Sequence, residues 1–296
     1  MRAVTFVTAF VSLGLTTGVL AEEPFGPASV PPAAQSFHLG TLKLTALHDA
    51  QFVVRNDGKT FGVDAGAGPV SELLRAAGAP TDRITLSVNA LLLRTGRRVL
   101  LLDTGIGPKV HGGLLASLGQ AGVPPSAVTD VLITHTHGDH IGGLLDASGQ
   151  LAFPKATIRM ASAEWAWLKK QGPEELVKAI ADHVGTFEPG ARIAPGVTSV
   201  ALDGHTPGHV GYEIVSGHSR LLDIGDLAHS SLVSLARPQW TMGFDNDATL
   251  AKTTRLNTLA RLAKEQELVF SPHFPFPGVG HVAADGGAFS WKAGIP

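Results

Sequence analysis

The sequence of 296 residues contains no cysteine, one tyrosine and three methionines, and only 16% of its residues are charged. Without cysteine the chain can form no disulfide framework, and any metal site must do without thiolate ligands. The formal net charge of −2 offers no basic surface, so neither a nucleic acid nor a membrane surface is an expected partner. The hydrophobic content of 44% is instead that of a chain with a sizeable core.

The first 21 residues have the pattern of a secretory signal peptide. Arg2 precedes an apolar stretch, and Val19, Leu20 and Ala21 form a small-residue cleavage site. Several threonines and the absence of a charged flank argue against a membrane anchor. We therefore expect export to the periplasm or the medium. Residues 22–36 are rich in proline and are predicted to be an unpacked tether, which leaves residues 37–296 for one folded domain.

Strand and helix signals alternate along this domain. Two apolar runs within residues 84–105 flank a Thr-Gly-Arg-Arg turn and predict a β-hairpin. A short buried strand is expected just before residue 133, and further strands at residues 156–161, 197–203, 211–216, 220–226 and 267–273. Helices are predicted at residues 70–77, 163–170, 174–183 and 248–264, the last with Asp247 as its N-cap. This mixture indicates a layered α/β or α+β architecture.

The segment "LITHTHGDHIGG" places three histidines and an aspartate within six residues. His135 and His137 are two apart in extended chain, so both rings project to one side and can share a metal ion. Gly138 then lets the backbone turn, so that Asp139 and His140 can face a second position. A lone histidine is usually a core or surface residue, but that explanation does not account for the run H-x-H-x-D-H. The pattern therefore predicts a metal site.

Further ligands are expected from distant strand ends. Three candidates lie beside glycine or proline next to a strand-like run: His209, Asp226 and His273. His205 lies four residues before His209 and is predicted to brace the loop rather than to bind metal.

This order of motifs resembles the metallo-β-lactamase superfamily over nearly all of residues 37–296. Within that superfamily, "LLRTGRRVLLLDTG", "DGHTPGH" and "HFPFPGVGH" are similar to segments of methyl parathion hydrolases and related lactonases. The resemblance implies a metallo-β-lactamase-fold hydrolase domain, which is a four-layer αβ/βα sandwich.

The resemblance also implies the roles of the site residues. One metal is held by His135, His137 and His209, the other by Asp139, His140 and His273, and Asp226 bridges them. Two divalent ions are thus expected, with zinc best suited to these ligands and manganese, iron or cobalt as alternatives. A hydroxide between metals ~3.5–4 Å apart would be the nucleophile. Asp139 could also pass a proton to the leaving group, and Asp103 is implied to orient a metal-binding imidazole.

Two residues are predicted to line the substrate pocket. Trp167 falls where the resembled hydrolase has a pocket tryptophan, with ordinary core packing as the alternative. His229 falls where short-chain lactonases place a tyrosine, three residues after the bridging aspartate, and could donate a hydrogen bond to a lactone carbonyl.

The predicted activity is hydrolysis of a lactone or ester, including acyl-homoserine lactones in quorum quenching. Similar phosphotriesterases carry an aromatic residue soon after the Asp-Thr-Gly turn, whereas this chain offers His111, so organophosphate hydrolysis is the alternative. A β-lactamase is disfavoured because such enzymes usually lack a bridging aspartate at the position of Asp226. An exported metal-binding protein is the non-enzyme alternative. The hydrophobic content of 44%, exposed-looking stretches such as residues 53–63 and the resemblance together predict a homodimer.

Overall fold

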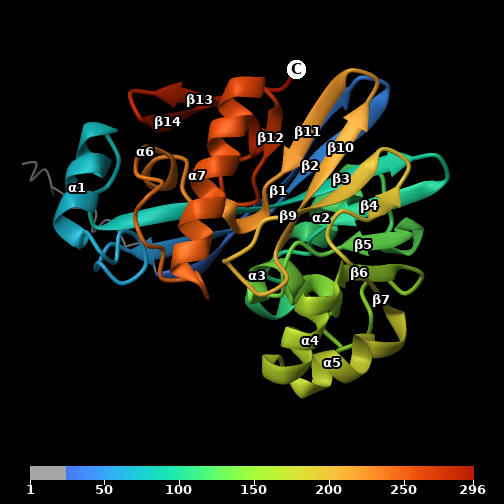
Figure 1. Ribbon diagram of the computed structural model, residues 1–296. Helices are drawn as coiled ribbons and strands as arrows, with labels where there is room; N and C mark the ends of the chain where they lie inside the picture. Colours follow the sequence, from blue (N-terminus) through green and yellow to red (C-terminus); the bar gives the residue numbers. More distant parts are fainter. Residues whose placement is uncertain (1–24) are drawn as a thin grey trace, which may run out of the picture.

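The computed structural model describes residues 25–296, which form two seven-stranded β-sheets with helices around them (Figure 1). The first sheet contains, side by side, β1 (Gly26–Leu39), β2 (Leu42–Arg55), β3 (Arg83–Thr95), β4 (Arg98–Leu102), β5 (Asp130–Leu132), β6 (Thr157–Ala161) and β7 (Val184–Phe187). The second sheet contains, in spatial order, β14 (Ala288–Ala293), β13 (Val279–Asp285), β12 (Leu268–Phe270), β11 (Ser219–Asp223), β10 (Val210–Ser216), β9 (Val197–Ala201) and β8 (Arg192–Ala194).

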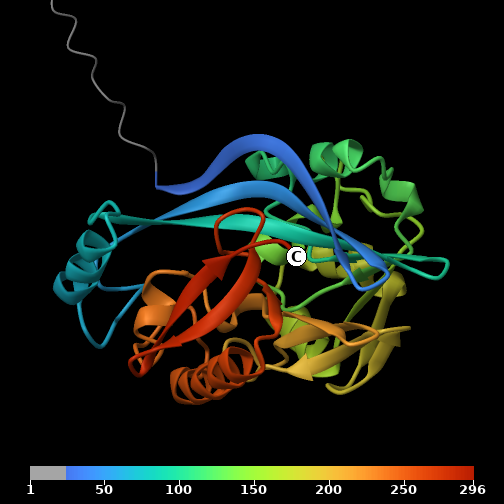
Figure 2. The same ribbon diagram turned by 90° about the horizontal axis from the view of Figure 1, so that it is seen from above.

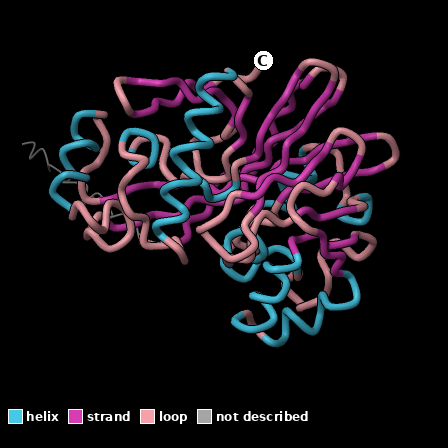
Figure 3. Tube along the Cα trace, in the orientation of Figure 1, coloured by secondary structure: helices cyan, strands magenta, loops and turns pink. Residues whose placement is uncertain are grey.

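The helices lie outside the two sheets (Figure 3). They are α1 (Ala67–Ala76), α2 (Leu114–Gln120), α3 (Gly138–Ile141), α4 (Ser162–Gln171), α5 (Glu174–Ile180), α6 (Val233–Ala236) and α7 (Ala248–Glu265). Leu118 of α2 and Leu168 of α4 pack on the first sheet, and Leu259 of α7 packs on the second. A separate apolar cluster, which includes Leu100 and Phe270, fills the space between the sheets. This is the predicted four-layer αβ/βα sandwich.

Several elements expected from the sequence are present. Strands β3 and β4 form the predicted hairpin, with Thr95 paired to Arg98 across the turn. Helix α7 begins after Asp247, whose carboxylate accepts hydrogen bonds from the backbone N–H groups of Thr249 and Leu250. No helix within residues 25–296 is both long and apolar enough to cross a membrane.

The proline-rich segment is not a tether, and this prediction was wrong. Residues 26–39 form β1, which pairs antiparallel with β2 and runs beside it across the molecule (Figure 2). The register shifts between Ser29 and Ala33, and Pro31 and Pro32 lie in this irregular stretch. A proline lacks a backbone N–H, so a bulge in an edge strand is where a sheet can accept it. The folded domain therefore includes residues 26–36, while the predicted signal peptide lies outside the described residues.

The topology brings the ends of several strands to one region. Strand β4 is parallel to β5 in the first sheet, and β11 is parallel to β12 in the second. Carboxyl ends of parallel neighbours meet at the same edge of a sheet. The loops that leave β4, β5, β11 and β12 carry Asp103, the histidine run, Asp226 and His273 respectively.

Candidate metal centre

The first candidate group of ligands consists of His135, His137, His205 and Asp226. His135 and His137 follow β5, and His205 lies in the loop between β9 and β10. The Nε2 atom of His135 lies 3.0 Å from Nδ1 of His137 and 3.2 Å from Nε2 of His205, and the latter two atoms are 3.0 Å apart. Three ring nitrogens this close cannot all satisfy one another through hydrogen bonds, because each ring offers one donor at most in its neutral form.

A tetrahedral zinc ion fits this arrangement. Zinc bound to imidazole nitrogens at about 2.0–2.1 Å holds two such nitrogens about 3.3 Å apart. The distances of 3.0 to 3.2 Å among these three nitrogens are close to that value. The side chains of His135, His205 and Asp226 are buried, so bulk water cannot form hydrogen bonds with their polar atoms. The group is therefore suited to hold a cation.

His205, and not the predicted His209, is the third histidine of the first ligand group. The Nδ1–H of His209 donates to the backbone oxygen of Leu202 at 2.8 Å, and its Nε2 accepts from the backbone N–H of Asp226 at 3.0 Å. Burial lowers the pKa of His209 to about 3, so this ring is neutral. Both of its nitrogens are occupied, and the prediction that His209 is a metal ligand is corrected. His209 instead fixes the backbone at Asp226.

Gly225 is needed for this contact. Its backbone has a φ of +44°, and a Cβ atom at this position would lie 2.5 Å from Nε2 of His209. Any side chain would therefore push the imidazole away from the backbone of Asp226. The glycine directly before Asp226 is therefore required for a steric reason.

The second candidate group consists of Asp139, His140 and His273. Asp139 and His140 lie in the short helix α3, and His273 follows β12. The Nε2 atoms of His140 and His273 are 3.3 Å apart, and Oδ2 of Asp139 lies 3.8 Å and 3.5 Å from them respectively. These three residues are the ones that the sequence analysis assigned to one metal.

Asp226 lies between the two groups. Its Oδ1 atom is 3.1 Å from Nε2 of both His140 and His273, while its Oδ2 atom is 3.3 Å from Nε2 of His205 and 3.5 Å from that of His135. Oδ1 also has no hydrogen-bond partner among the described residues. One carboxylate oxygen thus faces each group, which is the geometry a bridging ligand needs.

Asp103 supports the second group. Its backbone has a φ of +59°, a conformation that non-glycine residues adopt only when the surroundings enforce it. In this position Oδ2 accepts a hydrogen bond from Nδ1–H of His140 at 2.8 Å, so the Nε2 atom of that ring is turned towards the centre. Burial opposes charging of His140, but Asp226, Asp139 and Asp103 outweigh it and raise its pKa well above the usual value. The predicted orienting role of Asp103 matches this geometry.

Asp245 and Arg255 orient His205, and neither residue was predicted from the sequence. The Nδ1–H of His205 donates to Oδ1 of Asp245 at 3.0 Å, and Oδ2 of Asp245 pairs with the buried guanidinium of Arg255 at 2.7 Å. Burial alone would lower the pKa of His205, but the carboxylates of Asp226 and Asp245 raise it to about 9. A carboxylate behind a ligating histidine fixes its tautomer and strengthens it as a ligand.

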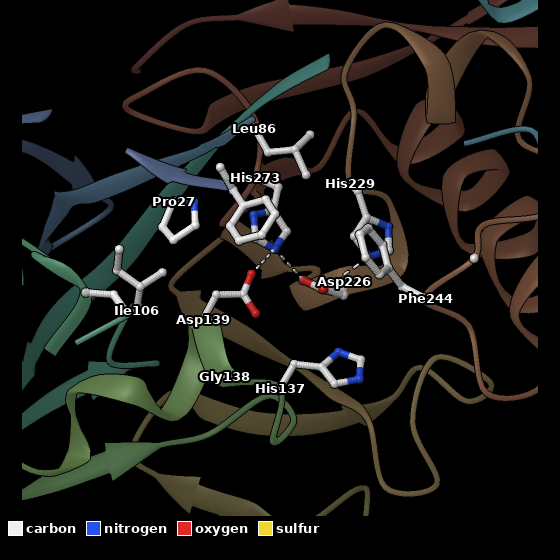
Figure 4. A pocket seen from close by; sticks show the side chains of 13 residues that line it. Pro27, Leu86, Ile106, His137, Gly138, Asp139, Asp226, His229, Phe244 and His273 are labelled. Carbon is white, nitrogen blue, oxygen red and sulfur yellow. Dashed lines mark ion pairs between the residues drawn. The ribbon is translucent and has the colours of Figure 1, made fainter. Parts of the chain in front are cut away.

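A cavity of about 700 Å³ opens above the two groups (Figure 4). Asp139, Asp226 and His273 lie at its base, and apolar side chains surround them: Pro27, Phe52, Leu86, Ile106, Val110 and Phe244. His229 also lines this cavity, as the sequence analysis expected. Its Nε2 atom lies 3.1 Å from Oδ2 of Asp226, and its Nδ1 has no hydrogen-bond partner among the described residues.

Trp167 does not line this cavity. It lies in helix α4 and borders a separate cavity of about 390 Å³ behind His137 and Gly138. Its ring centroid is 5.8 Å from that of His137 in an edge-on arrangement. The structure therefore separates Trp167 from His229, because α4 packs behind the turn that carries His137 rather than over the metal groups.

The sequence matches the family model of the metallo-beta-lactamase superfamily over residues 83–273. The chain belongs to the metallo-β-lactamase superfamily. Two solved structures are similar to this superfamily member over 90% of its length. AidC, a dizinc quorum-quenching lactonase in complex with a product, N-hexanoyl-L-homoserine, has a TM-score of 0.82 at 27% identity with 99% of its chain covered. The hydrolase AbOPH has a TM-score of 0.81 at 29% identity with 98% of its chain covered.

This superfamily member is also similar in sequence to a curated lactonase. The N-acyl homoserine lactonase of Bacillus cereus is 24% identical over 216 residues, which are 66% of this chain and 84% of the relative. The comparisons thus include lactonases, while a resemblance to methyl parathion hydrolases in particular has no support among them.

Proposed function

We propose that this protein is a metal-dependent hydrolase with two metal ions that opens an N-acyl homoserine lactone or a closely similar lactone. The observation that carries the proposal is the position of Asp226 between two clusters of imidazoles at the base of an apolar cavity. The similarity to a dizinc lactonase over 90% of the chain supports the same activity.

The shape and lining of the cavity suit this substrate class. An N-acyl lactone has a polar ring that is hydrolysed and an apolar chain that gains from burial. In the cavity the polar groups of Asp139, Asp226 and His229 gather at the base, and the apolar side chains form the remaining wall. The lactone ring would therefore lie at the base with its acyl chain against Ile106 and Phe244.

The chemistry combines the bound metals with these residues. Divalent metals, when bound, lower the pKa of water towards neutrality and polarise a carbonyl group. His229 can donate a hydrogen bond to the negative charge that develops on the carbonyl oxygen, because its ring lines the cavity directly above Asp226. Asp139 has a side chain that is 27% exposed towards the cavity, and it can accept the proton that the attacking water releases and pass it to the alkoxide that leaves when the ring opens.

The zinc-loaded protein should be assayed with N-hexanoyl homoserine lactone, an aryl ester, an aryl phosphotriester and a cephalosporin. We expect the largest kcat/KM for the acyl lactone, and a lower value for homoserine lactone without an acyl chain. A larger kcat/KM for the phosphotriester or the cephalosporin would contradict the substrate assignment. Tight zinc binding without any turnover would instead favour an exported metal-binding protein.

Export and dimerisation are further parts of the proposal. Export rests on the sequence pattern of the first 21 residues, and dimerisation rests on the hydrophobic content of 44% and the exposed-looking stretch at residues 53–63. Light scattering at micromolar concentration should give twice the mass of one chain, and expression with the leader should yield protein outside the cytoplasm. A monomeric mass would contradict the dimer.

A further inference from the structure

Glu164 is a fully buried carboxylate that the proposed chemistry does not use. It lies in the first turn of α4, and its side chain is 0% exposed. Burying a carboxylate is unfavourable unless hydrogen bonds compensate the lost hydration. The partners of Glu164 are therefore informative about what this residue does.

The two carboxylate oxygens of Glu164 hold two different loops. Oε1 accepts hydrogen bonds from the backbone N–H and the hydroxyl of Thr136, both at 2.7 Å. Oε2 accepts from the hydroxyl of Thr206 at 2.7 Å and from the backbone N–H of Gly208 at 2.9 Å. Each oxygen thus accepts one threonine hydroxyl and one backbone N–H. Hydrogen bonds to a charged acceptor are the stronger kind.

These donors are adjacent to the histidines of the first group. Thr136 lies between His135 and His137, and Thr206 directly follows His205. The sequence His-Thr thus occurs in both loops, with the histidine turned towards the metal position and the threonine turned towards Glu164. One carboxylate therefore links the backbone segments of all three histidines in this group.

The close approach of Gly208 shows how tightly the second loop is held. A Cβ atom at Gly208 would lie 2.3 Å from the backbone nitrogen of Glu164. The loop between β9 and β10 therefore lies directly on the start of α4, and a side chain at this position would force the two apart.

The second group is held by other residues. The Nδ1–H of His140 donates to Asp103, and that of His273 donates to the backbone oxygen of Ser87 at 2.8 Å. Neither contact involves Glu164 or its four donors. A change at Glu164 should therefore affect the first group much more than the second.

We propose that Glu164 is a positioning residue that sets the metal affinity of the His135, His137 and His205 group by fixing the two loops that carry these histidines. The proposal rests on the two-metal site of the proposed function. It concerns the binding of metal and not the choice of substrate, so the two can fail separately.

The test is to measure the two stepwise zinc dissociation constants by competition with a chelator, for the parent and for Glu164→Gln. A glutamine has one acceptor oxygen, and its NH₂ group would face a backbone N–H donor, so one of the two loops loses its anchor. We expect one step to weaken by about 10- to 100-fold, the range typical of residues that orient metal ligands, and the other step to stay within about threefold.

Two backgrounds assign the affected step. In His273→Ala the remaining strong step belongs to the first group, and adding Glu164→Gln should weaken it. In His205→Ala the remaining step belongs to the second group, and the same addition should leave it unchanged. Equal weakening in both backgrounds, or none in either, would overturn the proposal.

Matched controls separate positioning from general destabilisation. Glu267→Gln changes another buried glutamate, one that pairs with Arg261 at the end of α7, and should alter neither step. Thr136→Val and Thr206→Val each remove a single hydroxyl donor at nearly constant shape, and each should weaken the same step by less than Glu164→Gln. These two variants decide the matter if Glu164→Gln fails to fold, and no effect in both would overturn the proposal. A parent protein that binds no zinc would overturn the proposed function as well.

Discussion

The Nε2 atom of His205 lies 3.0 Å from the Nδ1 atom of His137. This contact brings the loop between β9 and β10 to the turn after β5, and it makes His205 a member of the first metal group. His209, four residues further along the same loop, has both ring nitrogens engaged in hydrogen bonds to the backbone. The two histidines therefore have different roles and should respond differently to substitution.

His205→Ala should reduce the zinc content from about two ions to about one ion per chain, because it removes a ligand of the first group. His209→Ala should still bind about two ions under saturating zinc, with affinity lower by about 10- to 100-fold, because it removes a residue that orients a ligand. Elemental analysis after gel filtration measures both. The reverse pattern, with one ion in His209→Ala and two in His205→Ala, would show that His209 is the ligand.

Asp226→Ala should weaken both zinc steps, since one carboxylate oxygen faces each group. Asp285→Ala, at the exposed end of β13, is a control that should change neither step. Competition with a chelator gives both dissociation constants. An unaltered second step in Asp226→Ala would mean that this carboxylate serves one metal only.

His229→Leu keeps the bulk of the side chain and removes its hydrogen-bond donor. It should retain both zinc ions and lower the turnover of an acyl lactone by about 10²- to 10³-fold, the usual effect of losing a donor to a developing oxyanion. Activity on an aryl phosphotriester should be kept or raised, because a good leaving group departs without this assistance. If the rates on both substrates stay at the parent level, His229 makes no contact with the substrate.

Asp49 on β2 gives the stability of the fold a defined pH dependence. Its carboxylate accepts hydrogen bonds from the backbone N–H groups of Ile106 and Leu114, and burial raises its pKa from 3.8 to about 6. The folded state therefore binds a proton more tightly than the unfolded state between about pH 4 and pH 6, and the contribution of Asp49 to stability falls as the pH rises through this window.

The free energy of unfolding of the parent, relative to Asp49→Asn, should therefore fall by up to about 3 kcal/mol between pH 4 and pH 7. Urea unfolding of both proteins in the presence of a chelator measures the difference without a contribution from metal binding. A relative stability that increases with pH would have the opposite sign and would rule out a raised pKa for Asp49.

The elements that the sequence predicted are those with local signals. The β3–β4 hairpin has a glycine turn between apolar runs, and α7 has an aspartate N-cap. Strand β1 was missed because its prolines favour an irregular chain, and only the pairing with β2 makes it a strand. This pairing is a tertiary contact that no local window contains.

The same distinction applies to the site. The run from His135 to His140 was predicted because all its residues lie on one short segment. The choice between His205 and His209 depends on the backbone oxygen of Leu202, which the folded loop brings to His209. Asp245 and Glu164 act through distant partners and resemble ordinary surface acids in the sequence, so they could be found only in the structure.

We propose that two bound metals give this protein its lactonase activity. The most direct measurement is a zinc titration of the metal-free protein during hydrolysis of N-hexanoyl homoserine lactone. We predict no hydrolysis without metal and a maximal rate at about two zinc ions per chain. Hydrolysis that persists after exhaustive chelation, or a rate that is already maximal at one zinc ion per chain, would show that the activity does not need two metals.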